Sequence, residues 1–300
     1  RGIAVTCGNP RQDNLSVEGG FQSALEEMLW FDRHIEDKSQ YYLKGNKVLD
    51  IDRARADGKI AIFYITQNSD HFMRDLDNVD VFYGVGQRSC QLTYNYQNYA
   101  GSGCMETHGS GVTDFGGRLI EKLNDIGMMI DLSHANVQTT LDATDISSRP
   151  IHISHTTCAD VHENPRAMPD IALRAVAEKG GVIGMTQMRT FMTMLRYGMV
   201  DLYFDHIMHA VNVAGIDHVC IGSDRDHRRL VVTPEYLEEM QREQGQRFDI
   251  RRVPLYFEEL NSPRRMEVIW DKLIKRGLSE DTVEKITGLN IYNYYKEILG

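Results

Sequence analysis

Two short apolar runs of this 300-residue chain end in the same dipeptide, Ser-His, at Ser133-His134 and at Ser154-His155. Neighbouring parallel strands lie about 4.8 Å apart, so imidazoles just beyond the carboxyl ends of two such strands can reach one shared ion. Histidine is the most common side-chain ligand of zinc and similar metals. The repeat therefore predicts that His134 and His155 bind a metal. The alternative is that each is an ordinary hydrogen-bonded loop residue.

A carboxylate, Asp224, follows the last apolar run of the chain at a comparable position. A carboxylate at the end of a strand can orient or deprotonate a water molecule bound to a metal. Aspartate at such a place is also a common helix N-cap. Asp226 and His227 come directly afterwards, so the local sequence leaves the choice of proton acceptor open.

Arg166 lies in the segment HENPRAMPD, with a proline on either side. Guanidinium binds carboxylate through two parallel hydrogen bonds, so a rigid loop that carries arginine is suited to holding the carboxylate of a ligand. The alternative, judged from this loop alone, is a surface salt bridge.

Polar, uncharged side chains follow two other apolar runs, with Gln67 after one and Tyr94 after the other. They could line a substrate pocket or could simply cap turns. Neither is a good zinc ligand beside carboxylate, thiolate or imidazole. Eight further histidines lack a matching position, and we interpret them as structural or surface residues: His71, His108, His152, His162, His206, His209, His218 and His227.

Seven short runs rich in β-branched residues are predicted to be strands: residues 3–7, 60–66, 88–93, 128–132, 150–154, 181–185 and 218–222. Most are apolar on both faces, which is typical of parallel strands covered by helices. Amphipathic helical runs lie between them, as the spacing of Phe115, Leu119 and Leu123 illustrates. Alternating strands and helices over this length predict a parallel α/β fold.

The polar residues cluster after the carboxyl ends of these strands, which is where the active site of a TIM barrel lies. No glycine-rich phosphate loop follows an early strand, which weakens a nucleotide-binding alternative. We therefore predict a single (β/α)8 TIM barrel over residues 1–300. A closed barrel has eight strands and seven are found, so we expect the chain to be truncated before its first strand.

Composition narrows the choice of partners. A net charge of −10 repels nucleic acid and anionic membranes, so neither is expected to bind. No apolar run reaches the roughly 18–20 residues of a transmembrane helix. The five cysteines show no CxxC spacing, which predicts reduced thiols and a cytoplasmic location.

Four segments in this order resemble the membrane dipeptidase family of metallopeptidases: LNDIGMMIDLSHAN, PIHISHTTCADVHENPRAMPD, GGVIGM and VAGIDHVCIGSD. The resemblance extends over nearly the whole chain. It implies a barrel of the amidohydrolase type with two zinc ions, hydrolysis of dipeptides, and a homodimer. It also implies that His134 and His155 bind the second zinc, that Arg166 holds the substrate carboxylate, and that Asp224 acts on the water between the metals.

Three features depart from the pattern of that family. The family's first strand carries a His-x-Asp pair for the first zinc, and no such pair precedes residue 3. Gln67 stands where the family has a glutamate that bridges the two metals. Tyr94 stands where the family has a histidine that contacts the bond to be cleaved, and a tyrosine has a much higher pKa, about 10 against 6.5.

Two functions are therefore open from the sequence. The first is a zinc-dependent dipeptidase that uses one or two ions, or another divalent metal, with Asp224 as the base and Tyr94 polarising the carbonyl. The second is a diverged barrel with an altered metal site, which binds a small carboxylate or catalyses a non-peptidase reaction. Gln67 and Tyr94 favour the second, and the paired histidines with Arg166 favour the first.

Overall fold

The computed structural model describes residues 2–7, 17–195, 197–225, 233–244 and 253–300. The chain forms two compact units: Arg1–Ile153 with Lys179–Gly181 and Ile291–Gly300, and Ser154–Glu178 with Val182–Asn290. Each unit is described below by itself. Asp226 and His227, the alternative proton acceptors, lie outside the described residues. The prediction of a single domain over residues 1–300 stays a prediction.

The first unit contains a parallel sheet in which β3 lies next to β1, β2 and β4, β4 lies next to β5, and β5 lies next to the start of β6. Asp131 pairs with His152, so the strands that precede the two Ser-His motifs are neighbours, as predicted. The strands are β1 Gly2–Thr6, β2 Tyr42–Lys44, β3 Ile60–Thr66, β4 Gln87–Gln91 and β5 Met129–Asp131.

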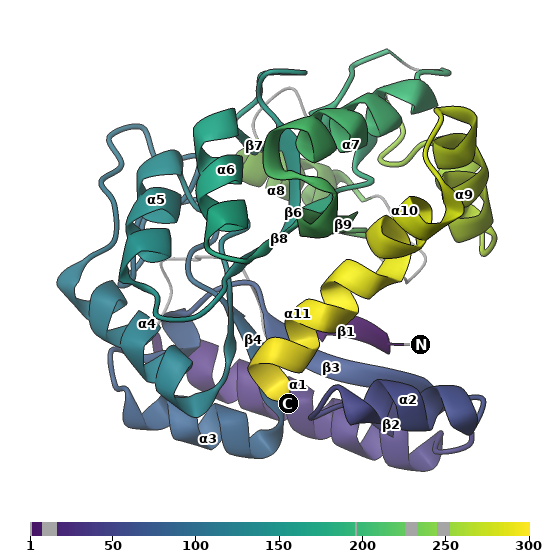
Figure 1. Ribbon diagram of the computed structural model, residues 1–300. Helices are drawn as coiled ribbons and strands as arrows, with labels where there is room; N and C mark the ends of the chain where they lie inside the picture. Colours follow the sequence, from purple (N-terminus) through teal and green to yellow (C-terminus); the bar gives the residue numbers. More distant parts are fainter. Residues whose placement is uncertain (1, 8–16, 196, 226–232, 245–252) are drawn as a thin grey trace. The chain divides into compact units, whose positions relative to one another are not determined.

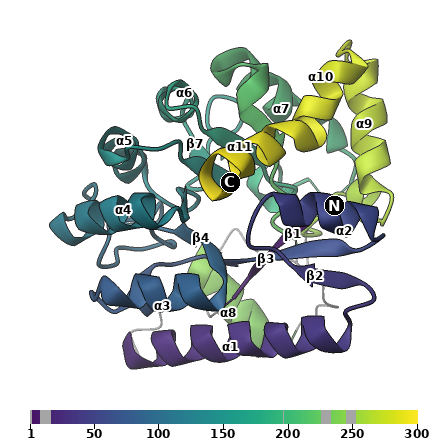
Figure 2. The same ribbon diagram turned by 60° about the horizontal axis from the view of Figure 1, so that its bottom comes forward.

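The helices of this unit are amphipathic and begin or end at recognisable signals. Thr113 caps α4 with its side-chain oxygen, which accepts a hydrogen bond from the Gly116 amide, and the helix ends at Gly127 in a left-handed conformation. Helices α1 and α3 lie side by side in both ribbon views (Figures 1 and 2). The helices are α1 Val17–Asp37, α2 Leu49–Ala56, α3 Asp77–Val85, α4 Asp114–Ile126, α5 Val137–Ile146 and most of α11 Asn290–Leu299.

Strand β4 is buried although its sequence, QRSCQ, is mostly polar. Gln87 donates to the Thr66 hydroxyl at 2.8 Å, and its amide oxygen lies 3.0 Å from His71 Nε2. Arg88 donates to three backbone carbonyls, those of Asn46, Tyr83 and Gln87. Buried polar groups are stable when they are paired, and here the pairing is internal to the unit.

The second unit contains the parallel strand order β7-β6-β8-β9. These strands are β6 His152–Cys158, β7 Ala167–Met168, β8 Val182–Met185 and β9 Val219–Ile221. Strand β6 corrects one expectation: it continues through Ser154-His155 instead of ending there, so His155 lies within a strand. The run TTC after His155 is β-branched and buried, and it continues the pairing with β8 through the Thr186 amide and the Thr156 carbonyl.

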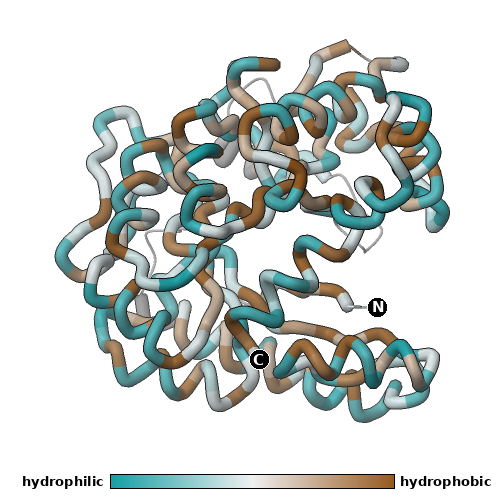
Figure 3. The backbone as a smooth tube through the Cα atoms, in the orientation of Figure 1, coloured by the Kyte–Doolittle hydropathy of each residue, from teal (hydrophilic) through white to brown (hydrophobic). Residues whose placement is uncertain are grey.

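The helices of the second unit follow the same amphipathic rule, and Figure 3 shows hydrophobic and hydrophilic residues alternating along them. Ser279 caps α10, because its side-chain oxygen accepts a hydrogen bond from the Thr282 amide. The helices are α6 Asp170–Glu178, α7 Val200–Ala214, α8 Pro234–Gln244, α9 Arg265–Lys275 and α10 Glu280–Glu284, followed by a π-helical segment at Lys285–Leu289.

The α/β class with parallel strands is confirmed, and each of the seven predicted strands overlaps an observed one. Strands β2 and β7 were not predicted, because segments of three and two residues carry no periodic signal. All five cysteines are free thiols. Among the described residues, no helix combines the length and apolar character that crossing a bilayer requires.

Candidate functional site

Three of the predicted site residues belong to the first unit and share one edge of its sheet. Gln67, Tyr94 and His134 each follow the carboxyl end of a strand, β3, β4 and β5 respectively. Carboxyl ends of parallel strands meet at the same edge of a sheet, so these three residues lie at one edge, and their roles stay a prediction.

The His134 side chain is held on two sides. Its Nδ1 lies 2.7 Å from Oδ1 of Asn95, and its ring stacks on Tyr94 with centroids 4.1 Å apart and planes 23° apart. The residue is 4% exposed and has a left-handed backbone, φ 65°. Such a conformation is uncommon outside glycine and is often found at functional sites.

Gln67 is half-buried directly after β3. Its carbonyl accepts a 2.8 Å hydrogen bond from the side chain of Gln91, which also donates to the Thr93 carbonyl at 2.7 Å. The loops after β3 and β4 are joined again by Asn98, whose amide donates to Asn68 Oδ1 at 2.8 Å. The position is thus firmly built, but its side chain is a neutral amide and not a carboxylate.

The other three predicted residues belong to the second unit. His155 Nε2 lies 3.8 Å from Oδ1 of Asp224, and His155 Nδ1 lies 2.8 Å from the Ser154 hydroxyl. Asp224 also has a left-handed backbone, φ 47°. Gly222 lets the chain before Asp224 pass close to the backbone of Ser154 and His155. A Cβ at this position would lie 2.0 Å from the Ser154 carbonyl oxygen and 3.0 Å from His155 Cα.

Arg166 is 6% exposed, so its guanidinium is not at the surface. Asn164 Oδ1 accepts from its backbone amide at 3.0 Å, and its carbonyl accepts from the Thr156 hydroxyl at 3.0 Å. The guanidinium lies over the Phe191 ring at 5.0 Å. Among the described residues its buried Nε has no hydrogen-bond partner and no carboxylate pairs with it, which argues against the salt-bridge alternative.

The donors of the second unit fit a divalent ion. Two ligand atoms bonded to one zinc at about 2.0–2.2 Å each cannot lie more than about 4.3 Å apart, and the 3.8 Å between His155 Nε2 and Asp224 Oδ1 is within that limit. In the first unit His134 contributes an imidazole, while Gln67 contributes only a weak amide oxygen. The imidazole and carboxylate donors fit a divalent metal, and Gln67 does not fit the bridging position.

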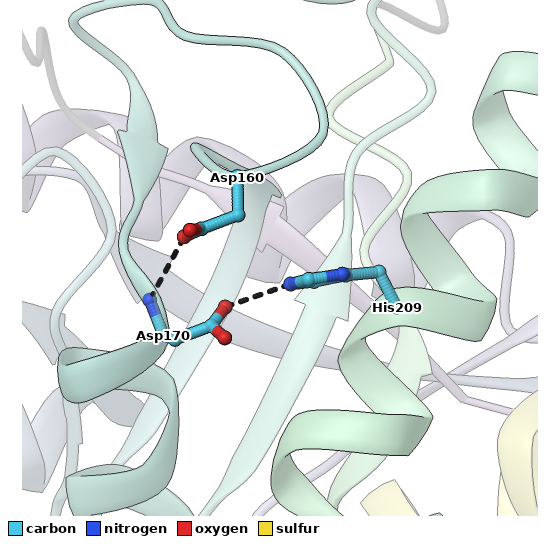
Figure 4. Close-up of side chains that lie close together, drawn as sticks. All are labelled: Asp160, Asp170 and His209. Atoms are coloured by element: carbon cyan, nitrogen blue, oxygen red, sulfur yellow. Dashed lines mark hydrogen bonds and ion pairs between the residues drawn. The ribbon is translucent and has the colours of Figure 1, made fainter.

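A second group of metal-competent side chains in the second unit was not predicted (Figure 4). His209 Nε2 lies 2.7 Å from Asp170 Oδ1, and Asp160 Oδ2 accepts from the Asp170 amide at 3.4 Å. Arg174 pairs with the other oxygen of Asp170 at 3.2 Å. Arg174 from α6 and His209 from α7 already contact the Asp170 carboxylate, so we interpret this group as polar pairing that joins α6 to α7. Its members come from three segments, and no spacing in the sequence joins them.

Comparison with known proteins identifies the family of the chain. Residues 2–243 match the model of the membrane dipeptidase family, peptidase family M19. The chain belongs to the membrane dipeptidase family. Over 227 residues it is 33% identical to dipeptidase verJ of Clonostachys rogersoniana, covering 75% of this chain and 50% of that protein. An uncharacterized dipeptidase of Schizosaccharomyces pombe is 27% identical over 81% of this chain and 54% of its own length. The chain thus spans about half the length of these relatives.

Solved structures confirm the predicted fold class. An amidohydrolase from Pseudomonas aeruginosa matches with a TM-score of 0.87 and 26% identity, over 100% of this chain and 88% of that one. A metallopeptidase from Rhodobacter sphaeroides, solved with a phosphinate mimic of the dipeptide L-Ala-D-Ala, matches with a TM-score of 0.80 and 18% identity, over 99% and 86%. The predicted fold class of this chain, a TIM barrel of the amidohydrolase type, is therefore confirmed.

Proposed function

We propose that this chain carries the site of a metal-dependent dipeptidase. The observation that carries the proposal is Arg166: a buried guanidinium whose Nε has no partner among the described residues of a chain that belongs to the membrane dipeptidase family. A buried, incompletely paired cation is costly, and a bound carboxylate would offset that cost. The free carboxyl end of a dipeptide is such a group, and a fixed clamp on it restricts the enzyme to short peptides.

His134 and His155 are the proposed metal ligands, with zinc as the proposed metal. A divalent metal bound there would lower the pKa of a coordinated water and polarise the peptide carbonyl. Gln67 offers no bridging carboxylate, so we propose that these residues hold one ion more tightly than a second.

Asp224 is the proposed proton acceptor and donor. Its carboxylate lies 3.8 Å from His155 Nε2, where it can take a proton from the attacking water and later deliver that proton to the leaving amine. Tyr94 stacks on His134, and its phenol is the proposed donor to the carbonyl oxygen of the scissile bond. Water adds to the carbonyl carbon, the C–N bond breaks, and the products are two free amino acids.

The test is hydrolysis by the chain, purified without chelators, of a panel of L,L and L,D dipeptides with added zinc, manganese or cobalt. We expect turnover with metal, loss of turnover and of metal content in His134→Ala and His155→Ala, and a fall in kcat of about 10³-fold or more in Asp224→Asn. Arg174→Ala, which alters an exposed ion pair of the same unit, is the matched control and should retain activity. Absence of turnover with all three metals would contradict the proposal.

A second candidate function follows from Gln67, which cannot bridge two metals as a carboxylate does. The chain would then be a diverged barrel that uses Arg166 to bind a small carboxylate without cleaving a peptide. Binding of N-acetyl amino acids, measured by calorimetry in the absence of dipeptide turnover and lost in Arg166→Met, would favour this candidate.

The remaining expectations concern the oligomeric state and the cellular location. We propose a homodimer on the strength of the family resemblance, and sedimentation equilibrium would test it. A cytoplasmic location stays a prediction that depends on the five free thiols.

A further inference from the structure

The hydrogen bond between Asn95 and His134 defines which ring nitrogen carries the proton. Asn95 Oδ1 lies 2.7 Å from His134 Nδ1, and the Cys104 thiol donates to the same oxygen at 3.8 Å. The structure places the oxygen of the Asn95 amide, and not its nitrogen, at both contacts. An amide oxygen only accepts hydrogen bonds, so His134 Nδ1 must donate.

A neutral imidazole has one N–H, so a proton on Nδ1 leaves Nε2 with its lone pair. That lone pair is what a metal requires, and a hydrogen bond to the opposite nitrogen is the usual way in which proteins set the tautomer and orientation of a ligating histidine. We propose that Asn95 is a positioning residue that fixes His134 in the Nδ1-protonated form and presents Nε2 to the metal. This inference rests on the proposed function, because it assigns a role within the same site.

The backbone around Asn95 makes this geometry rigid. The Asn95 carbonyl accepts from the Met105 amide at 2.7 Å, and the His134 carbonyl accepts from the Cys104 amide at 2.8 Å. The segment 103–105 therefore joins the loops that carry the two residues. Gly103 is required there, because a Cβ would lie 2.0 Å from the Tyr94 carbonyl oxygen and 2.3 Å from the Asn95 carbonyl carbon. Asn95 itself is 1% exposed, so water does not compete for its amide.

The contact at Nδ1 of the other proposed ligand differs in kind. His155 Nδ1 faces the Ser154 hydroxyl at 2.8 Å, and a hydroxyl can donate or accept, so this contact is compatible with either tautomer. Because the two contacts differ, we expect a substitution at Asn95 to change the tautomer of His134 and not that of His155.

The experiment compares three variants of the whole chain. Asn95→Leu removes the acceptor at similar volume, Asn95→Asp retains an oxygen that accepts from Nδ1, and Asn124→Leu is the matched control. Asn124 is another buried asparagine of the first unit, and it accepts from Ser147 at 3.1 Å. Zinc affinity is measured by competition with a chromogenic chelator, and the His134 ring is assigned by 15N–13C NMR of the metal-free protein. Thermal melting reports folding.

We expect Asn95→Leu to lose the Nδ1-protonated signature and to bind zinc about 10–100-fold more weakly. Asn95→Asp should keep both, and Asn124→Leu should lower the melting temperature with zinc affinity unchanged. The inference is overturned if folded Asn95→Leu keeps the tautomer and the affinity, or if Asn95→Asp is as weak as Asn95→Leu. Failure of the wild-type chain to bind zinc or to turn over dipeptides would instead contradict the proposed function, because the tautomer is read without metal.

Discussion

Arg88 in the first unit and Arg166 in the second unit are both buried, and these two arginines differ in their partners. In the first unit Arg88 donates to three backbone carbonyls and lies over the Tyr83 ring at 4.1 Å. In the second unit Arg166 lies over Phe191, and its Nε has no partner among the described residues. Burial alone therefore does not distinguish them, since they are 8% and 6% exposed.

The difference separates a structural role from a binding role. Buried polar groups in native proteins are nearly always paired, and an exception calls for an explanation such as a ligand. Arg88 satisfies this rule within the fold, whereas the Nε of Arg166 has no partner among the described residues, as expected of an arginine that binds a ligand. The same contrast applies to the histidines, because His134 is oriented by an amide acceptor and His155 by a hydroxyl that can act in either direction.

The largest effects on stability and on activity are expected from two single substitutions, Arg88→Met and Arg166→Met. Arg88→Met removes three charge-assisted hydrogen bonds from a buried strand, so the free energy of unfolding should fall by about 3–5 kcal/mol. Arg166→Met should leave the unfolding free energy unchanged or higher, and should lower kcat/KM for dipeptides by about 10²–10³-fold. Denaturant unfolding and steady-state kinetics measure the two quantities.

A dipeptide amide, which lacks the terminal carboxylate, is the control substrate for Arg166→Met and should be little affected by the substitution. Equal destabilisation by the two substitutions would remove the distinction between the arginines.

Acid should destabilise both units through one histidine each. Burial lowers the pKa of His71 in the first unit and of His206 in the second unit to about 4. In the unfolded chain a histidine pKa is about 6.5, so between pH 6.5 and 4 the unfolded state binds protons that the folded state does not. The free energy of unfolding should therefore fall as the pH is lowered through this window, by about 3 kcal/mol per histidine.

Denaturant unfolding at pH 7 and pH 4.5 measures this effect. His71→Leu and His206→Leu should each flatten the dependence by its own share, whereas His108→Leu, a substitution at an exposed histidine, should not. A pH dependence that is identical in all four proteins would contradict the assignment.

Tyr94→Phe tests whether the first unit contributes chemistry as well as scaffold. The substitution keeps the ring that stacks on His134 and removes only the hydroxyl. We expect kcat to fall by about 100-fold, which is typical of losing one donor to a developing oxyanion, while zinc affinity stays the same. Tyr41→Phe, at a residue that is 60% exposed, is the control and should leave kinetics unchanged.

The smallest effect is expected at the ion pairs of the second unit. Arg174 pairs with Asp170 at 3.2 Å but its side chain is 54% exposed, so Arg174→Ala should cost less than about 1 kcal/mol and less still in high salt. A larger loss of unfolding free energy, measured by denaturant unfolding, would show that Arg174 stabilises Asp170 as much as His209 does.

Much of the architecture could be predicted because it is encoded in local patterns. The run IAIFYIT predicts β3 with its observed limits, and the spacing of Phe115, Leu119 and Leu123 predicts α4. The end of β6 could not be predicted, because the polar Ser154-His155 resembles a strand end although the strand continues. The partner of His134 could not be predicted either, because Asn95 lies 39 residues away in sequence.

The sequence by itself determined the types of donor and their order: two Ser-His pairs at neighbouring strands, an arginine between prolines, and a final aspartate. It also determined the parallel α/β class, since apolar runs that are buried on both faces require helices to cover them. The tertiary structure alone decided that Asn95 contacts His134, that Arg166 is buried with an Nε that pairs with no other described residue, and that Gly222 admits His155 beside Asp224. The physical reason is that hydrogen bonding and close packing join residues from different loops, and neither leaves a periodic trace in the chain.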